Sequence, residues 1–136
     1  MLGEREPEIY GKTTLAEIEA SCRAAAERLG MDIEFRQSNS EADLVAWIQG
    51  AKGKADGIVI NAAAFTHTSV AILDALKLFS APVIELHISN PLNREPFRRR
   101  SYITPAATGL ICGFGPHGYV LALEAMSHLL GERSGG

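Results

Sequence analysis

The sequence predicts one α/β domain in which a parallel β-sheet is covered by helices on both faces. Two observations predict this fold: short β-branched runs alternate with amphipathic helical patterns, and a single helix-length segment separates successive runs. Parallel strands that are joined by right-handed helical crossovers place their helices on the faces of the sheet. At 136 residues the chain has the length of one domain, and we expect residues 1–136 to form it.

The first helical pattern runs from Thr13 to Leu29, where apolar residues recur at intervals of three and four. Thr14 and Glu17 have the spacing of a capping box, so we expect the helix to begin beside them. Gly30 suits the left-handed residue that commonly follows a helix end.

The segment from Asp32 to Arg36 alternates apolar and polar residues, which predicts a half-buried or edge strand. A second helix is expected after a short loop, because Ser40 and Asp43 have the spacing of a helix start. Gly53 is expected to end this helix.

The second half of the chain continues the alternation. Gly57 to Asn61 is a continuous β-branched run, typical of a central strand that is covered on both faces. The elements expected after it are a helix over Thr68 to Phe79, a strand over Pro82 to His87, a strand over Gly109 to Phe114, and a helix over His117 to Leu130. Gly131 should end the last helix, with residues 132–136 as a frayed tail. Residues 88–108 show no period, and long loops in compact domains are usually functional.

Composition restricts the class of function. Hydrophobic residues make up 46% and charged residues 21%, as in ordinary soluble proteins. The net charge of −3 disfavours a general binder of nucleic acid or of anionic membranes. No apolar run approaches the roughly 20 residues that span a bilayer, and we expect a cytoplasmic protein. Cys22 and Cys112 form no CxxC pair and are expected to be reduced core thiols.

The strand ends indicate where a site should lie. Asn61 and His87 end two successive predicted strands, and each opens a loop rich in polar residues. Ligands of parallel α/β sheets bind at the carboxyl ends of the strands. We therefore expect the functional site beside these two residues.

Four segments together resemble the type II 3-dehydroquinate dehydratases. They are Leu2 to Gly11 (LGEREPEIYG), Arg36 to Asn39 (RQSN), Asn61 to Ser69 (NAAAFTHTS) and Glu85 to Asn90 (ELHISN), followed by Arg98, Ser101-Tyr102 and Gly118-Tyr119. Their order and spacing cover nearly the whole chain. The resemblance implies a flavodoxin-like, doubly wound fold and trimers that group as a dodecamer. It also implies anti elimination of water from 3-dehydroquinate through an enolate, giving 3-dehydroshikimate without metal or cofactor, in aromatic biosynthesis or in quinate breakdown.

The chain departs from the family pattern at its start. Family members usually open with an apolar strand and an Asn-Gly-Pro-Asn-Leu-Asn segment, and this chain opens just after that point. We therefore expect the first family strand to be missing from the sheet, which leaves the Asp32 to Arg36 strand without its usual partner. In the family the asparagine of that segment helps to hold the water that stabilises the enolate, so a chain that truly starts at Met1 is expected to lose part of its oxyanion support. The alternative is that this sequence lacks a native N-terminal segment.

Tyr10 and Arg5 are the candidates for base catalysis. By the resemblance, Tyr10 accepts the proton beside the ketone and Arg5 stabilises the transition state. A phenol has a pKa of about 10, so it is a competent base only where positive charge favours its anion. Lowering that pKa by about three units takes roughly 4 kcal/mol, which requires a water-excluded arginine pair. The alternative is a packed surface tyrosine beside a solvated arginine.

His87 and Glu85 are the candidates for acid catalysis. They are two residues apart, so their side chains should lie on the same face of the strand end. Such geometry lets the Glu85 carboxylate orient the His87 ring, while protonated His87 donates its proton to the leaving hydroxyl. The alternative is a strand-end histidine whose hydrogen bonds are merely structural.

Further residues are assigned to substrate binding. The backbone amides of Ile88 and Ser89 should form a nest for the substrate carboxylate. By family position Asn61, His67, Asp74 and Arg98 hydrogen-bond ring hydroxyls or support residues that do. The alternatives are that Asn61 ends a strand, that His67 belongs to a helix-start turn, and that Asp74 is a solvated helix residue. Residues 98–100 form a small basic patch without the aromatic residues of a nucleic-acid binder.

Three other classes of function are weaker. The departure at the start keeps open a non-catalytic binding or assembly module with the same fold. A nucleotide or flavin binder needs a Gly-rich phosphate loop after the first strand, and Gly113 and Gly115 form only a lone pair in the last strand-to-helix turn. The four histidines show no metal-ligand spacing, so no metal site is expected.

Overall fold

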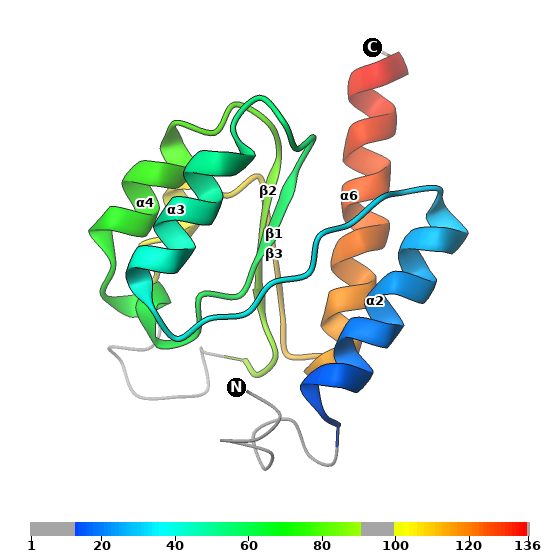
Figure 1. Cartoon of the computed structure of the whole chain (residues 1–136), viewed down its shortest axis with the longest axis horizontal. Coiled ribbons are helices and arrows are strands. Elements are labelled where there is room, and N and C mark those ends of the chain that lie inside the picture. Colours follow the sequence, from blue (N-terminus) through cyan, green and yellow to red (C-terminus); the bar gives the residue numbers. More distant parts are fainter. Residues whose placement is uncertain (1–12, 91–99, 136) are drawn as a thin grey trace.

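The structure is a computed structural model that describes residues 13–90 and 100–135. Its elements are α2 (Leu15–Leu29), α3 (Glu41–Ala51), β1 (Ile58–Ile60), η2 (Ala63–His67), α4 (Val70–Lys77), β2 (Val83–His87), η4 (Thr104–Ala106), β3 (Gly109–Cys112), η5 (Gly115–His117) and α6 (Gly118–Gly135). The three strands form a parallel sheet in the order β1-β2-β3. Helices α3 and α4 cover one face of this sheet, and α2 and α6 cover the other (Figure 1). The prediction of a parallel α/β fold is therefore confirmed.

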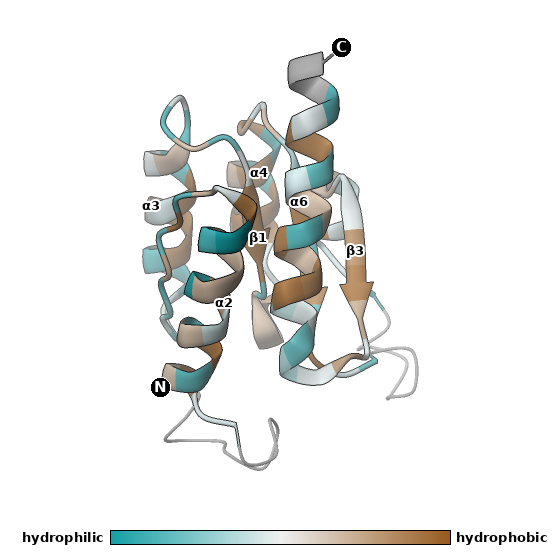
Figure 2. Ribbon diagram, turned by 90° about the vertical axis from the view of Figure 1, so that its right-hand side faces the viewer, coloured by the Kyte–Doolittle hydropathy of each residue, from teal (hydrophilic) through white to brown (hydrophobic). Residues whose placement is uncertain are grey.

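The core lies on both faces of the central strand β2, and the neighbouring strands β1 and β3 are largely hydrophobic (Figure 2). Val83 packs in a cluster with Ile72 of α4, whereas Ile84 packs against Met126 of α6. Successive side chains of a strand point to opposite faces, so Glu85 and His87 share the α3 and α4 face with Val83. A fully buried aliphatic side chain contributes about 1.5–3 kcal/mol, and this apolar packing holds β2 in place.

The helix starts are fixed by local side chains, as the sequence predicts. Thr14 Oγ1 accepts a hydrogen bond of 3.1 Å from the Glu17 amide, and Ser40 Oγ accepts one of 3.3 Å from the Asp43 amide. Gly30 closes α2 with φ 69°, in the left-handed region that glycine adopts at low cost. Caps of this kind contribute about 1 kcal/mol each.

The prediction of a strand over Asp32 to Arg36 is wrong. Ile33 and Phe35 do pack on the α2 and α6 side, and their polar neighbours are exposed, so the alternation of faces is real. Figure 1 shows the segment passing between the two helix layers on its way from α2 to α3. However, no backbone hydrogen bond joins residues 32–37 to β1 or to any other residue that the structure describes. Without a partner edge, extended backbone does not form a ladder.

The prediction that the Gly57 to Asn61 run is a central strand is also wrong, because β1 lies at the edge of the sheet of described strands. Its faces are covered nonetheless: Ile58 and Ile60 pack on the α3 and α4 side, and Val59 packs on the α6 side. The continuous apolar run reflects coverage of two faces, and it carries no information about the strand edges.

Several element ends differ from the prediction, and three of these differences have a clear local cause. Helix α4 begins at Val70 because Ser69 Oγ caps the Ile72 amide at 3.0 Å, and Thr68 precedes the cap. Strand β3 ends at Cys112, since the chain turns at positive-φ glycines. Helix α6 continues past Gly131 to Gly135, so residues 132–135 are no frayed tail. A glycine inside a helix lowers its stability by only about 1 kcal/mol. A 3.0 Å ion pair between His128 and Glu132 bridges the turn that contains Gly131.

Candidate active site

Glu85 and His87 come together at the carboxyl end of β2, as predicted. Glu85 Oε2 lies 2.6 Å from His87 Nε2, and the two side chains are 2% and 11% exposed. The pair combines a carboxylate that is almost entirely buried with an imidazole that retains access to the end of the sheet. Such a pair is suited to proton transfer.

The Glu85 carboxylate is held by hydroxyl groups as well as by His87. Ser101 Oγ donates to Glu85 Oε2 at 2.7 Å, and Thr104 Oγ1 donates to Oε1 at 2.6 Å. Burial alone would raise the pKa of the Glu85 carboxyl, but the hydrogen bonds from His87, Thr104 and Ser101 and the charge of His87 hold this pKa below its ordinary value. Glu85 is therefore ionised at neutral pH.

The ionisation of Glu85 determines which nitrogen of His87 carries a proton. An ionised carboxylate only accepts hydrogen bonds, so Nε2 of His87 must carry a hydrogen and donate it to Oε2. Nδ1 is consequently the nitrogen that gains or loses a proton.

Asn61 extends from the end of β1, the strand beside β2. Its Oδ1 accepts the Ala63 amide at 3.1 Å, and its Nδ2 donates to the Tyr119 hydroxyl at 3.3 Å. Burial raises the pKa of Tyr119, which therefore stays a neutral phenol. Ala63 adopts φ 51°, an uncommon value for a residue with a Cβ, and the side-chain Oδ1 of Asn61 stabilises this turn.

His67 is tied to the loop that follows residue 99. His67 Nδ1 lies 2.8 Å from the Arg100 carbonyl oxygen, and Nδ1 donates because a carbonyl only accepts. Two residues further along the loop, Tyr102 donates its amide to the Thr66 carbonyl at 2.8 Å. The η2 turn and this loop are thus fastened to each other beside the end of β2.

The other predicted binding residues are spread more widely. Ile88 is buried, and its carbonyl accepts the Gly115 amide at 2.9 Å, while the Ser89 side chain is exposed. Asp74 is exposed on α4 and makes no hydrogen bond with Glu85 or His87. The backbone nest at Ile88 and Ser89 stays a prediction. Arg5, Tyr10 and Arg98 lie outside the described residues.

Sequence reasoning missed two functional contacts, those of Ser101 and Thr104 with Glu85. Ser101 lies within the family pattern, and no motif of the sequence includes Thr104. The available signal was two hydroxyl residues on either side of Ile103, three positions apart, in a loop expected to be functional. The partner of these hydroxyls is not evident from local sequence.

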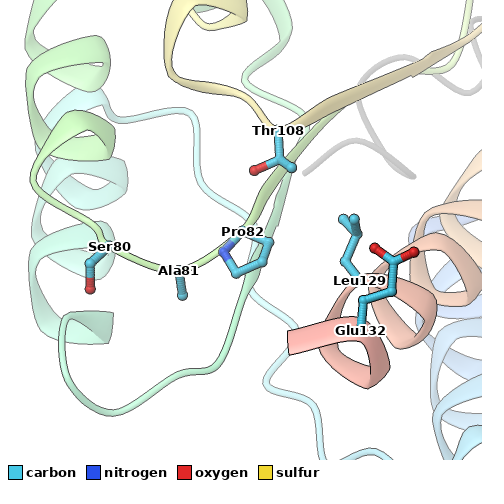
Figure 3. Close-up of a pocket in the computed structure, with 6 residues that line it drawn as sticks. All are labelled: Ser80, Ala81, Pro82, Thr108, Leu129 and Glu132. Atoms are coloured by element: carbon cyan, nitrogen blue, oxygen red, sulfur yellow. The ribbon is translucent and has the colours of Figure 1, made fainter. Parts of the chain in front are cut away.

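A shallow hollow of about 360 Å³ lies at the opposite end of β2 (Figure 3). Its lining residues come from two sides: Ser80, Ala81, Pro82 and Thr108 on one, and Leu129 and Glu132 of α6 on the other. Because Pro82 immediately precedes β2, the hollow marks the amino end of the strand. Ligands of parallel α/β sheets bind at the carboxyl ends of the strands. We therefore place the candidate active site at Glu85 and His87 and not at this hollow.

The part of the chain that the structure describes contains no group of three or more His, Cys, Asp or Glu side chains placed to hold a metal ion. None of its helices is both long and apolar enough to cross a membrane.

Comparison with known proteins places the chain in a family. Residues 1–127 match the family described as Dehydroquinase class II. A 3-dehydroquinate dehydratase of Rhizobium johnstonii is 59% identical over 129 residues, which cover 95% of this chain and 89% of that protein. The 3-dehydroquinate dehydratase 2 of Agrobacterium fabrum is 56% identical over 134 residues, covering 98% and 91%. The crystal structure of the type II dehydroquinase of Propionibacterium acnes superimposes with a TM-score of 0.87 at 44% identity, covering 93% and 88% of the two chains. The chain therefore belongs to the class II dehydroquinase family.

Proposed function

We propose that this protein is a 3-dehydroquinate dehydratase, a hydro-lyase that converts 3-dehydroquinate to 3-dehydroshikimate without metal or other cofactor. The observation that carries the proposal is the buried Glu85 carboxylate 2.6 Å from Nε2 of His87, at the sheet end where ligands bind. Relatives more than half identical to the chain bear the name of this activity.

The reaction is an anti elimination in two steps. The Tyr10 phenolate takes a proton from the carbon beside the ketone, and the electron pair forms an enolate, with Arg5 favouring the phenolate and the transition state. The enolate then collapses, the carbon–oxygen bond breaks, and protonated His87 gives its Nδ1 proton to the leaving hydroxyl, which departs as water. Glu85 keeps the His87 ring oriented throughout.

Substrate recognition falls to the surrounding loops. The amides of Ile88 and Ser89 hold the substrate carboxylate. The ring hydroxyls are bound or indirectly supported by Asn61, His67, Asp74 and Arg98. The tie between the His67 ring and the Arg100 carbonyl, at 2.8 Å, supports this assignment because it sets two of these segments side by side.

The chain is further proposed to act as one domain over residues 1–136, in the cytoplasm, as a dodecamer built from trimers. Two large apolar side chains support an assembled state: Leu110 is 51% exposed and Phe114 is 61% exposed, near the outer edge of β3. Sedimentation velocity on the purified protein tests the assembly. A single monomeric species at micromolar concentration contradicts it.

Initial rates on 3-dehydroquinate test the function, because the conjugated product absorbs in the ultraviolet and no metal is added. His87→Ala and Tyr10→Phe should each lower kcat by roughly 10²-fold or more. His128→Ala is the matched control, since the His128 side chain is 71% exposed and its ion-pair partner among the described residues is the surface residue Glu132. A folded wild-type protein without turnover, or a fully active His87→Ala variant, contradicts the proposal.

A further inference from the structure

A carboxylate buried in a strand needs hydrogen-bond donors on both of its oxygens. Glu85 is 1% exposed as a whole residue, and it lies on the sheet face that α3 and α4 cover with apolar side chains. An isolated ionised carboxylate in such surroundings is strongly destabilised. Here both oxygens are bonded: Oε2 accepts from His87 and Ser101, and Oε1 accepts from Thr104.

The two hydroxyls are held rigidly by their own loop. Ser101 Oγ accepts the amides of Ile103 and Thr104 at 3.0 and 3.1 Å, so its hydroxyl hydrogen is left to donate to Glu85. Ile103 is 0% exposed and belongs to the core cluster beside α4. Tyr102 fastens the loop to the η2 turn through the 2.8 Å bond to Thr66. The loop therefore presents both donors from an anchored backbone.

Together these contacts fix the rotation of the carboxylate group. A carboxylate bonded through one oxygen can turn about its last side-chain torsion, because that torsion is soft. Only one orientation of the carboxylate lets one oxygen accept from Thr104 while the other accepts from both Ser101 and His87. In that orientation Oε2 points at Nε2 of His87, at 2.6 Å.

We propose that Ser101 and Thr104 are positioning residues of this active site: they lock the Glu85 carboxylate so that it binds the Nε2 hydrogen of His87 and leaves Nδ1 to deliver the proton. This inference rests on the proposed function for the catalytic role of His87. The contacts that carry it are independent of that role. Neither hydroxyl is required to touch substrate, so their loss should reduce turnover more than substrate affinity.

Steady-state kinetics of four variants test the positioning. Ser101→Ala and Thr104→Val should each lower kcat about tenfold, the effect of losing one hydrogen bond to a charged group, with KM within about twofold of wild type. Ser101→Thr and Thr104→Ser restore the hydroxyl and should recover most of kcat. An unchanged kcat in both hydroxyl-free variants overturns the proposal, as does a loss that appears only in KM.

Thr108→Val is the matched control. Thr108 Oγ1 accepts the Val83 amide at 3.1 Å, so this variant removes a hydroxyl that contacts the opposite end of β2. Its melting temperature should fall as in Thr104→Val, while its kcat stays at the wild-type value. An equal fall of kcat in Thr108→Val would show that general loosening of β2 explains the effect, and the proposal would fail.

Nitrogen NMR of the His87 ring provides a test that needs no turnover. In the wild-type protein the neutral ring should be a single tautomer with its hydrogen on Nε2, and the Ser101→Ala, Thr104→Val double variant should populate both tautomers. Wild-type tautomer populations in the folded double variant overturn the positioning role even if its turnover is reduced. If the wild-type protein shows the Nε2 tautomer but no dehydratase activity, the proposed function fails and the positioning geometry stands.

Discussion

Glu85→Gln is the sharpest single perturbation of this site, because it removes the charge and keeps the shape. Three donors face the present carboxylate, from His87, Ser101 and Thr104. A glutamine offers them one acceptor oxygen and places an NH₂ group where the other oxygen was. If the NH₂ group takes the place of Oε2, it faces the Nε2 hydrogen of His87, and a donor meets a donor. If it takes the place of Oε1, the Thr104 hydroxyl must turn to accept from it, and every bond of the group loses the carboxylate charge.

The size of the effect follows from those contacts. A hydrogen bond to a charged group contributes about 1.5–3 kcal/mol, against about 0.5–1.5 kcal/mol for a neutral one, so three bonds that lose the carboxylate charge weaken the site by about 3 kcal/mol together. We expect Glu85→Gln to lower the free energy of unfolding by about 3 kcal/mol and kcat by roughly 10²-fold, the lower range for a general acid that has lost its orientation. Glu34→Gln is the control, since Glu34 forms only an exposed pair with Arg36 and is 80% exposed.

Urea denaturation at several pH values and initial rates on 3-dehydroquinate check this prediction. The pKa of Glu85 is lowered in the folded protein, so its ionised form stabilises the fold at pH values above the ordinary glutamate pKa of 4.5. That contribution is lost as the pH falls through the folded-state pKa, and the difference in stability between wild type and Glu85→Gln should shrink accordingly. A difference that stays constant or grows towards acid pH refutes the reasoning, as does a kcat within twofold of wild type.

Three predictions concern the rest of the chain. In urea titrations Gly30→Ala should lower the free energy of unfolding by about 1 kcal/mol, because Gly30 has φ 69°. Gly50→Ala should raise it by about 0.5 kcal/mol, because Gly50 lies within α3 and an added Cβ there meets nothing within 4 Å. Changes of the same sign in the two variants contradict this prediction. Burial raises the pKa of Cys22 to about 11 from 9.0, so iodoacetamide should label it about a hundredfold more slowly in the folded protein than in urea; equal rates contradict its burial. Hydrogen exchange should be faster at Val59, whose amide points away from β2, than at Ile84 of the central strand among those that the structure describes. The reverse order contradicts this topology.

The parts of the fold that the sequence predicts correctly are those determined by near neighbours. The start of α2 needs only Thr14 and Glu17, three residues apart, and its end needs only the conformational freedom of Gly30. The pairing of Glu85 with His87 follows in the same way from the two-residue period of a strand. Each of these features is encoded within one turn or one strand.

The failures involve distant partners. The hydroxyls of Ser101 and Thr104 reach Glu85 across 16 and 19 residues, and nothing in the local pattern indicates that they meet. The segment from Asp32 to Arg36 has the correct alternation for a strand but finds no edge to pair with among the described residues. A periodic pattern predicts which side chains of a segment are buried. It does not predict which other strand, if any, hydrogen-bonds to the backbone of that segment.

The site and the fold depend on the same hydrogen bonds at the end of β2. An ionised Glu85 is tolerated on a core-facing position because Ser101 and Thr104 supply donors, and those donors also set the direction in which His87 is held. Stability and turnover should therefore fall together when these donors are removed, so a lower melting temperature alone cannot identify their role. The tautomer of the His87 ring separates the two effects, because loosening of the strand lowers stability without shifting the ring hydrogen, whereas release of the carboxylate shifts it.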